Sequence, residues 1–251
     1  MNQRYLIGIA VLGLVTATSP LTAAGPGPHW GYAGHEGPAH WGQIDKGYAP
    51  CKLGKEQSPI DIKGAAKAQL PAIAFDYKGG PLKVINNGHT VQVNFDKGSS
   101  IKVGDKRYDL LQTHFHTPSE ELVNGKAYDM VWHLVHKSAE GKLAVVGVLV
   151  KSGAKNSAIE TVSANLPGQV GKEQAAAGAT INPATLLPAN RGYYHFVGSL
   201  TTPPCSEGVS WYVLKEPIEA APGQIRKFSA IFGSNARPVQ PLNTRTVKES
   251  L

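Results

Sequence analysis

Short apolar runs rich in β-branched residues, each bounded by turn-forming residues, recur along most of this 251-residue chain. Runs of this kind are typical of strands, because branched side chains pack well on a pleated sheet. Turn-forming sequences such as Asn86-Asn87-Gly88 separate neighbouring runs. We therefore predict a mostly β fold with a mainly antiparallel sheet. The clearest strand candidates are residues 90–95, 130–135, 143–150 and 209–214.

Two segments have apolar residues at helical spacing instead, and we expect them to form peripheral helices. Asn156-Ser157 is typical of the start of a helix, and Pro222-Gly223 precedes the second segment. The apolar positions are Ile159, Val162 and Leu166 in the first segment and Ile225, Phe228 and Phe232 in the second.

Residues 1–24 have the features of a secretory signal peptide. Arg4 supplies the positive charge, and residues 5–17 form an apolar run that is too short to span a bilayer. Small residues at 22–24 predict cleavage after Ala23 or Ala24, and an uncleaved N-terminal anchor is the alternative. No later stretch is apolar enough to cross a membrane. We therefore expect a periplasmic or secreted protein with no stable membrane insertion after cleavage.

Residues 25–251 are predicted to form one domain, because after the Gly/Pro-rich linker at 25–28 the sequence shows no change in composition and no internal repeat. The formal net charge is +7. The Lys and Arg residues are scattered, however, and no basic cluster carries interleaved aromatic residues. We therefore predict a solvated basic surface and no nucleic-acid partner.

The chain has two cysteines, Cys51 and Cys205, far apart in the sequence. Neither belongs to a Cys-x-x-Cys pair, which argues against redox catalysis or a cysteine zinc site. Export favours oxidation, so one long-range disulfide is the simplest interpretation. Two free buried thiols are the alternative.

Two histidines, His114 and His116, flank Phe115 in a short extended segment. Side chains alternate across a strand, so both imidazoles point to the same side. A third histidine on a neighbouring strand, either His133 or His136, completes a tripod that suits Zn²⁺ and leaves one position for water. His133 and His136 are three residues apart and face opposite sides of a strand, and their spacing alone does not choose between them. Histidines without a metal are the alternative.

A series of longer motifs follows in order along the chain. They are His29-Trp30-Gly31-Tyr32, Gly37-Pro38, His40-Trp41, Gln57-Ser58-Pro59-Ile60, Asn86-Asn87-Gly88-His89, Gln112-Thr113-His114-Phe115-His116, Ser119-Glu120, His133-Leu134-Val135-His136, Gly198-Ser199-Leu200-Thr201-Thr202-Pro203-Pro204 and Asn235-Ala236-Arg237-Pro238. In this order and spacing, the chain resembles the alpha-class carbonic anhydrases, especially the exported bacterial ones.

The resemblance implies a catalytic domain on a large twisted central sheet, and the reversible zinc-dependent hydration of carbon dioxide to bicarbonate and a proton. It selects His133 as the third zinc ligand beside His114 and His116. Thr201 matches the residue whose hydroxyl accepts a hydrogen bond from zinc-bound hydroxide, and Glu120 matches the carboxylate that orients this threonine. Because an ionised carboxylate only accepts hydrogen bonds, Thr201 donates to Glu120.

Other residues gain their roles from the resemblance alone. His89 matches the proton shuttle, a task suited to an imidazole that titrates near neutral pH, although alone it is an ordinary turn histidine. Gln112 matches the partner that fixes the tautomer of His114. Cys51 and Cys205 match the disulfide of exported members. The residues that match the carbon dioxide pocket are Val135, Val145, Leu200, Thr202, Val209 and Trp211.

The implied small-molecule partners are carbon dioxide, bicarbonate and water. Exported bacterial members of the family are often dimers, so a homodimer is a state that the resemblance allows.

Two positions depart from the family pattern. The family usually has a glutamate two residues before its third histidine ligand, where it accepts a hydrogen bond from that ligand, and here the position is Val131. Asp129 has the same strand parity but lies further away. Losing such an acceptor typically weakens metal affinity or activity roughly 10–100-fold, although a water can replace it. Glu121 stands where the family usually has a histidine, and we hypothesise that the two changes compensate each other.

The same residues argue against three competing functions. A non-catalytic relative that uses the fold as a binding module is expected to lose a zinc histidine, and all three are present. Esterase side activity is compatible with the zinc site. The chain has no His-Glu-x-x-His and no Gly-x-Ser-x-Gly motif, which argues against a zincin protease and a serine hydrolase.

Overall fold

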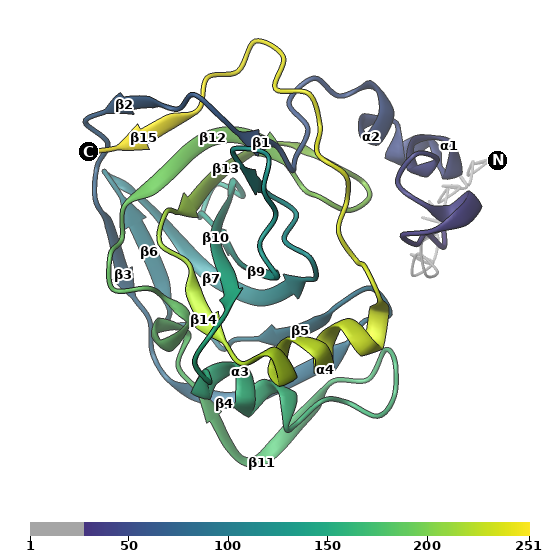
Figure 1. Ribbon diagram of the computed structural model, residues 1–251, viewed down its shortest axis with the longest axis vertical. Coiled ribbons are helices and arrows are strands. Elements are labelled where there is room, and N and C mark those ends of the chain that lie inside the picture. The colour runs from purple at the N-terminus through teal and green to yellow at the C-terminus, as the bar shows by residue number, and fades with distance from the viewer. Residues whose placement is uncertain (1–27) are drawn as a thin grey trace, which may run out of the picture.

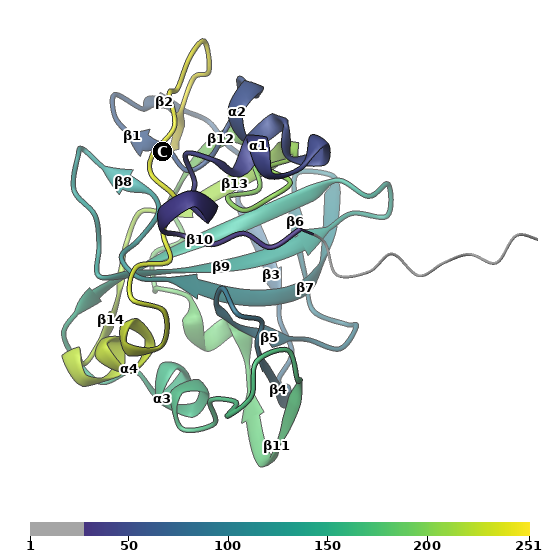
Figure 2. The same cartoon turned by 90° about the vertical axis from the view of Figure 1, so that its right-hand side faces the viewer.

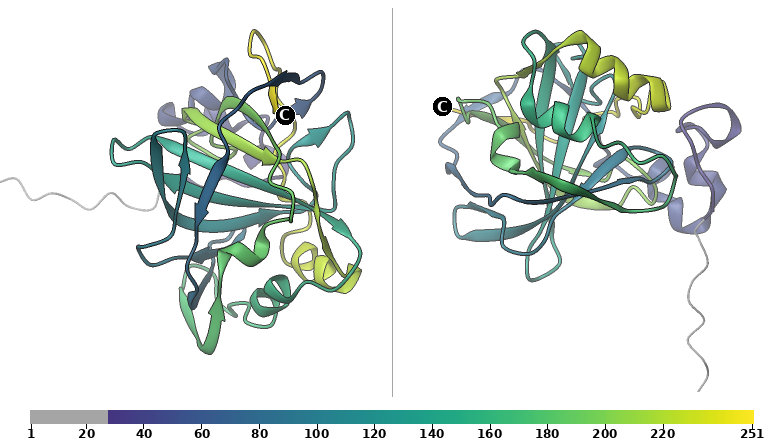
Figure 3. Two further views of the ribbon diagram at one scale, coloured as in Figure 1. Left: turned by 90° about the vertical axis from the view of Figure 1, so that its left-hand side faces the viewer. Right: turned by 90° about the horizontal axis from the view of Figure 1, so that it is seen from below.

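The computed structural model describes residues 28–251 and places one large sheet at the centre, with helices around it (Figure 1). The predicted signal peptide and most of the predicted linker lie outside the described residues. Among residues 28–251, no helix is long and apolar enough to span a bilayer. Figure 3 shows from two further sides that the helices surround the sheet and do not interrupt it.

Fifteen short segments of the described chain form strands. They are β1 (Asp61–Ile62), β2 (Ala66–Ala68), β3 (Ile73–Asp76), β4 (Gly80–Asn86), β5 (Val91–Asn94), β6 (Ser100–Val103), β7 (Lys106–His116), β8 (Leu122–Val123), β9 (Met130–Lys137), β10 (Leu143–Ser152), β11 (Gln174–Ile181), β12 (Tyr193–Ser199), β13 (Glu207–Leu214), β14 (Ile218–Ala220) and β15 (Lys248–Ser250). The helices are η1 (Gly34–Glu36), α1 (Trp41–Ile44), η2 (Lys46–Tyr48), α2 (Pro50–Leu53), α3 (Ser157–Ser163), η3 (Pro183–Leu186) and α4 (Pro222–Phe232), where η marks a 3₁₀ helix.

Thirteen of these strands form the central sheet, whose main path runs β11-β4-β5-β7-β9-β10-β13-β12-β15-β2. Strands β7, β9 and β10 lie side by side in it (Figure 2). Most neighbours are antiparallel, and β10–β13, β10–β14 and β15–β2 are parallel pairs. Strands β1 and β8 form a separate parallel pair. The predicted mostly β, mainly antiparallel fold is confirmed.

The local predictions agree with these elements except at one helix end. The four strand candidates correspond to β5, β9, β10 and β13. The Asn156 side chain accepts a hydrogen bond from the Ile159 amide at 3.1 Å and so caps α3, as expected. Helix α3 ends at Ser163, so Leu166 lies beyond it, contrary to the helical spacing that predicted a longer helix. Leu166 still packs against the core.

The two faces of strand β9 belong to different apolar clusters. Met130, Trp132 and Leu134 join the larger cluster, which also contains Phe228 of α4. Val131 and Val135 join a second cluster on the opposite face, with Val145, Val209 and Trp211. Because side chains alternate along a strand, His133 shares the face of the second cluster and His136 faces the first. His136 is fully buried there, and its Nε2 lies 2.8 Å from the Tyr77 hydroxyl.

A bulge in β7 determines which residues of that strand share the face of His133. Leu110 pairs with His136, whereas Gln112 pairs with Val135, so one extra residue of β7 lies between the two pairs. An extra residue reverses the alternation of the strand. Beyond the bulge His114 therefore pairs with His133, and His116 pairs with Val131.

The N-terminal helices are tied to the sheet by a disulfide between Cys51 in α2 and Cys205 in the loop that follows β12. The two Cα atoms are 5.0 Å apart, and the cysteines are separated by 154 positions in the sequence. The predicted disulfide is confirmed. Since the loop that follows β12 also carries Thr201, the bond connects the N-terminal segment to that loop.

Replacing both cysteines by alanine is expected to lower the free energy of unfolding by about 2–5 kcal/mol, because the bond restricts a long loop in the unfolded chain. Denaturant unfolding of the wild type and of the Cys51→Ala/Cys205→Ala variant, both treated with chelator, measures this difference. Equal unfolding free energies would contradict the prediction.

Candidate metal centre

Three histidines from neighbouring strands converge on one point. His114 and His116 extend from β7 and His133 from β9, where His133 lies directly opposite His114. Their ring centroids are 5.1, 5.4 and 4.9 Å apart in the three pairs. Each ring offers one nitrogen, and these three nitrogens lie within 4.8 Å of one another. The structure therefore brings together the three histidines that the resemblance selected.

The other nitrogen of each ring is held by a hydrogen-bond acceptor. His114 Nδ1 donates to Gln112 Oε1 at 2.8 Å, and His116 Nδ1 donates to the backbone carbonyl oxygen of Asn235 at 2.7 Å. His133 Nε2 lies 3.2 Å from Glu121 Oε2. A proton on each of these nitrogens leaves His114 Nε2, His116 Nε2 and His133 Nδ1 with free lone pairs.

Burial keeps two of the imidazoles neutral. Burial, together with a smaller effect of the neighbouring His133, lowers the pKa of His114 to about 3. Burial likewise holds the pKa of His116 well below its usual value. Burial also opposes a proton on His133, but the charge of Glu121, the hydrogen bond to it and the charge of Glu120 together raise the pKa of His133.

These residues fit a metal ion. His116 Nε2 is fully buried, and it has no hydrogen-bond partner among residues 28–251. Neutral imidazole nitrogens are preferred ligands of Zn²⁺, and three of them with one open position are typical of a catalytic site. We therefore identify His114, His116 and His133 as a group able to hold zinc.

Glu120 lies beside the histidines and is fully buried. Its Oε2 is 3.3 Å from His116 Nε2, and its Oε1 accepts a hydrogen bond from the Arg237 amide at 2.8 Å. The Thr201 side chain lies beside this carboxylate, where it helps to lower the pKa of Glu120. The pKa of Glu120 is raised to about 8 in total: burial raises it most and the charge of Glu121 adds to this, whereas His133, the Arg237 amide and Thr201 partly offset the rise. A bound cation would favour the ionised carboxylate.

The two departures from the family pattern both concern the surroundings of His133. Val131 is buried and apolar on the face of His133. Glu121 is also fully buried, and its carboxylate contacts His133. Asp129 is exposed and accepts a hydrogen bond from the Ser152 amide at 2.6 Å. Of these three positions, Glu121 therefore supplies the acceptor for His133.

His89 lies at the rim of the site in a turn that precedes β5. The Asn87 side chain accepts hydrogen bonds from the amides of His89 and Thr90, both at 2.9 Å, and so holds the turn. The half-buried His89 ring stacks on Trp30, with centroids 3.7 Å apart. Burial lowers the pKa of His89, and His29 lowers it further.

A small cavity of about 110 Å³ opens beside the metal-binding histidines. His89, His114, His116, Gln112 and Thr202 are among its lining residues. Behind the histidines lies the second apolar cluster, which contains Val135, Val145, Val209 and Trp211, with Leu200 packed against it. The Trp211 ring meets His133 edge to face, with centroids 4.9 Å apart. The site therefore has a polar entrance and an apolar wall.

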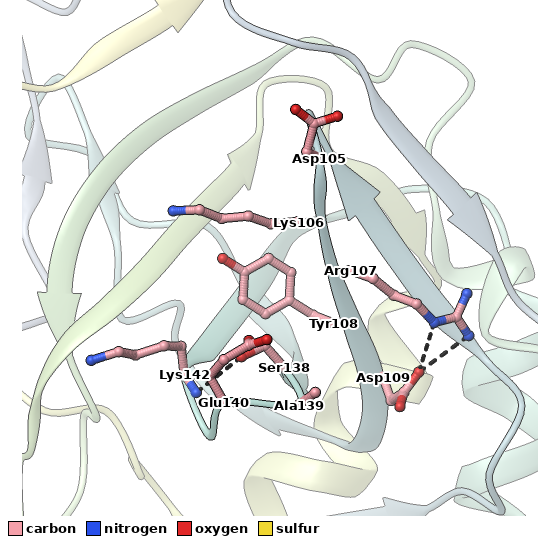
Figure 4. A pocket seen from close by; sticks show the side chains of 9 residues that line it. All are labelled: Asp105, Lys106, Arg107, Tyr108, Asp109, Ser138, Ala139, Glu140 and Lys142. Atoms are coloured by element: carbon pink, nitrogen blue, oxygen red, sulfur yellow. Dashed lines mark hydrogen bonds and ion pairs between the residues drawn. The ribbon is translucent and has the colours of Figure 1, made fainter.

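A wider hollow of about 570 Å³ lies elsewhere, between the turn that leads into β7 and the turn between β9 and β10 (Figure 4). Its lining mixes acidic and basic side chains, and Arg107 pairs with Asp109 inside it. None of the residues assigned to the metal site lines this hollow. We therefore place the chemistry in the smaller cavity.

Two residues support the site although the sequence assigned no role to them. Asn235 accepts from His116 through its backbone, and its side chain donates to the carbonyl oxygens of His89 and Phe115, both at 3.1 Å. The buried Arg237 guanidinium donates to the backbone oxygen of Cys51 at 2.9 Å. Both belong to the Asn235-Ala236-Arg237-Pro238 motif, but long-range contacts of this kind leave no local signal.

Comparisons with known proteins agree with this arrangement. Residues 36–251 match the family model described as eukaryotic-type carbonic anhydrase. A carbonic anhydrase from Nostoc sp. is 43% identical, covering 98% of this chain and 96% of the relative. The alpha-carbonic anhydrase of Thermovibrio ammonificans, solved with the inhibitor sulfanilamide, superposes with a TM-score of 0.86 at 46% identity, covering 89% of this chain and 100% of that one. The Photobacterium profundum alpha-carbonic anhydrase gives 0.83 at 44% identity, covering 88% and 100%.

Zinc is expected to stabilise the chelator-treated protein by about 4 kcal/mol at a free concentration 1,000 times its Kd, because only the folded chain assembles the three histidines. Thermal unfolding with and without zinc measures this effect. His116→Ala should remove it, and His35→Ala, which changes an exposed histidine, should not. Equal stabilisation of His116→Ala and the wild type would contradict the assignment.

Proposed function

This chain belongs to the eukaryotic-type carbonic anhydrase family, whose members are lyases that hydrate carbon dioxide, and we propose that it catalyses this reaction with zinc held by His114, His116 and His133. One observation carries the zinc assignment. Each of the three imidazoles has one nitrogen bonded to an acceptor, and the remaining nitrogens gather within 4.8 Å of one another.

Zinc held by His114, His116 and His133 would lower the pKa of a water ligand toward neutrality and so supply a nucleophile for carbon dioxide. Thr201 orients this water. We propose that its hydroxyl donates to the neighbouring Glu120 carboxylate, which leaves its lone pairs to accept a hydrogen bond from the water. Glu120 is held in turn by the Arg237 amide. This chain of hydrogen bonds restricts the water to one orientation.

Carbon dioxide has no charge and no hydrogen-bond donor, so an apolar wall beside the metal suits it better than a polar one. We propose that Val135, Val145, Leu200, Val209 and Trp211 form this wall. Thr202 lines the cavity together with His114 and His116. We propose that it also contacts the substrate there.

His89 is proposed to carry the released proton between the site and the solvent. It lines the same cavity as His114 and His116, and it is only half-buried. An imidazole in this position can accept a proton on the inner side and pass it to buffer on the outer side.

We further propose that residues 1–24 direct export and that the mature protein works in the periplasm or outside the cell. The disulfide between Cys51 and Cys205 supports an oxidising compartment. A homodimer remains part of this proposal, and sedimentation of the mature chain tests it.

Stopped-flow hydration of carbon dioxide by the zinc-loaded mature protein tests the activity. We expect rapid hydration by the wild type and a loss of about 100-fold or more in Thr201→Val, which keeps the shape of the side chain but removes the orienting hydroxyl. Zinc content should be equal in both proteins. If the zinc-loaded wild type hydrates no faster than buffer, the catalytic function is excluded.

The proton-transfer role of His89 is tested by His89→Ala in dilute buffer. The value of kcat should fall at least about 100-fold, since a positioned proton carrier typically contributes that much, and added imidazole should restore it. A lowered pKa keeps His89 neutral, and able to accept a proton, to more acidic pH. On the acid side of the wild-type pH profile, kcat falls as His89 becomes protonated. The midpoint of this fall should therefore lie below pH 6.5, the usual pKa of an imidazole. An unchanged kcat in His89→Ala would rule out the role.

A further inference from the structure

We propose that Glu121 is the positioning residue that orients His133 toward the metal, and that it replaces an acceptor on strand β9 itself. This inference rests on the proposed function. It concerns the affinity of the protein for zinc, however, and can be tested without measuring the hydration of carbon dioxide.

The contact is direct and enclosed. Glu121 Oε2 lies 3.2 Å from His133 Nε2, and both side chains are buried. Within residues 28–251 the carboxylate has no second donor, because Oε1 is buried without a hydrogen-bond partner. A buried carboxyl group needs a hydrogen-bond partner, and here that partner is the histidine.

The contact also selects the nitrogen that faces the metal. An ionised carboxylate accepts hydrogen bonds and cannot donate them, so the proton of a neutral His133 stays on Nε2. The lone pair is then on Nδ1, the nitrogen on the other side of the ring. A charge-assisted bond of this kind is roughly twice as strong as a neutral one, and it increases the basicity of the ligand.

The backbone around Glu121 fixes the carboxylate in place. The Ser119 hydroxyl donates to the Glu121 carbonyl oxygen at 2.8 Å, and the Leu122 amide donates to the Ile60 carbonyl oxygen at 3.2 Å. The next two residues form β8, which pairs with β1. The segment between β7 and β8 is therefore anchored on both sides of Glu121.

Strand β9 offers no replacement acceptor on the face of His133. Val131 lies two residues before His133 on the same face, about 6.6 Å along the strand, where a longer polar side chain could reach the ring. Valine has no acceptor atom, and it is fully buried against the second apolar cluster. Glu121 reaches the same ring from the neighbouring loop.

The test compares zinc affinity in variants of these two positions. Glu121→Ala removes the acceptor, and the Kd for zinc, measured by chelator competition, should increase about 10–100-fold. Glu121→Gln keeps an uncharged acceptor of the same shape, so its zinc affinity should decrease less than that of Glu121→Ala. Glu160→Ala is the matched control, because it removes a glutamate from α3, remote from the histidines, and should leave the Kd unchanged.

A relocation variant separates orientation from general destabilisation. Val131→Glu combined with Glu121→Ala places one acceptor on β9, and it should recover most of the zinc affinity lost in Glu121→Ala. Val131→Glu alone sets two buried carboxylates against one imidazole, so we expect it to be less stable than the double variant. The visible absorption of the cobalt-loaded proteins reports the ligand geometry, and it should change in Glu121→Ala and return toward the wild type in the double variant.

Each outcome decides the proposal. A wild-type Kd for zinc in Glu121→Ala would overturn it. The proposal would also be overturned if the weaker zinc binding of Glu121→Ala were matched by an equal loss of stability in its metal-free form and the double variant recovered no zinc affinity. If the wild type itself binds no zinc, both this inference and the proposed function fail. If the wild type binds zinc tightly but hydrates no carbon dioxide, only the proposed function fails.

Discussion

The pairing of β7 with β9 is the constraint on which the site depends. His114 faces His133 only in this register, and a shift by one residue would turn one set of side chains to the other face of the sheet. The bulge between Leu110 and Gln112 moves the even-numbered positions of β7 from one face of the sheet to the other. Before it, Leu110 contributes to the larger core, and after it the histidines face the second cluster. The sheet thus combines a well-packed interior with a polar site on its opposite face.

Around this frame, each ligand is held by an acceptor from a different part of the chain. Gln112 belongs to the same strand as His114, Asn235 follows α4, and Glu121 follows β7. The buried Arg237 extends the network, because its amide holds Glu120 while its guanidinium reaches Cys51 beside the disulfide. Burial lowers the pKa of Arg237 only to about 10, so the guanidinium stays charged at neutral pH. The three histidines, the loop that carries Thr201 and the N-terminal helices therefore form one connected unit.

The sequence predicts the parts of this arrangement that depend on local patterns. Branched runs revealed the long strands, and a period of two placed His114 and His116 on one side. The choice of His133 over His136 needed a resemblance to a known family, because the decisive fact is the strand register. The bulge near Leu111 and the end of α3 before Leu166 were not anticipated, since tertiary packing sets both. The sequence supports only the hypothesis that Glu121 and Val131 compensate each other. The contact of Glu121 with His133 itself depends on the path of a loop.

The position of Glu121 makes positions 121 and 131 dependent on each other. A site with an acceptor at either position holds His133, whereas a site with neither leaves the ring loose, and a site with both crowds two negative charges into a buried space. Exchanging one arrangement for the other by single substitutions must pass through one of these two poorer states. The pair is therefore epistatic, and the effect of a residue at either position is defined only together with the other. If position 131 were considered alone, the metal site would be taken to have lost an acceptor, although Glu121 supplies that acceptor from another position.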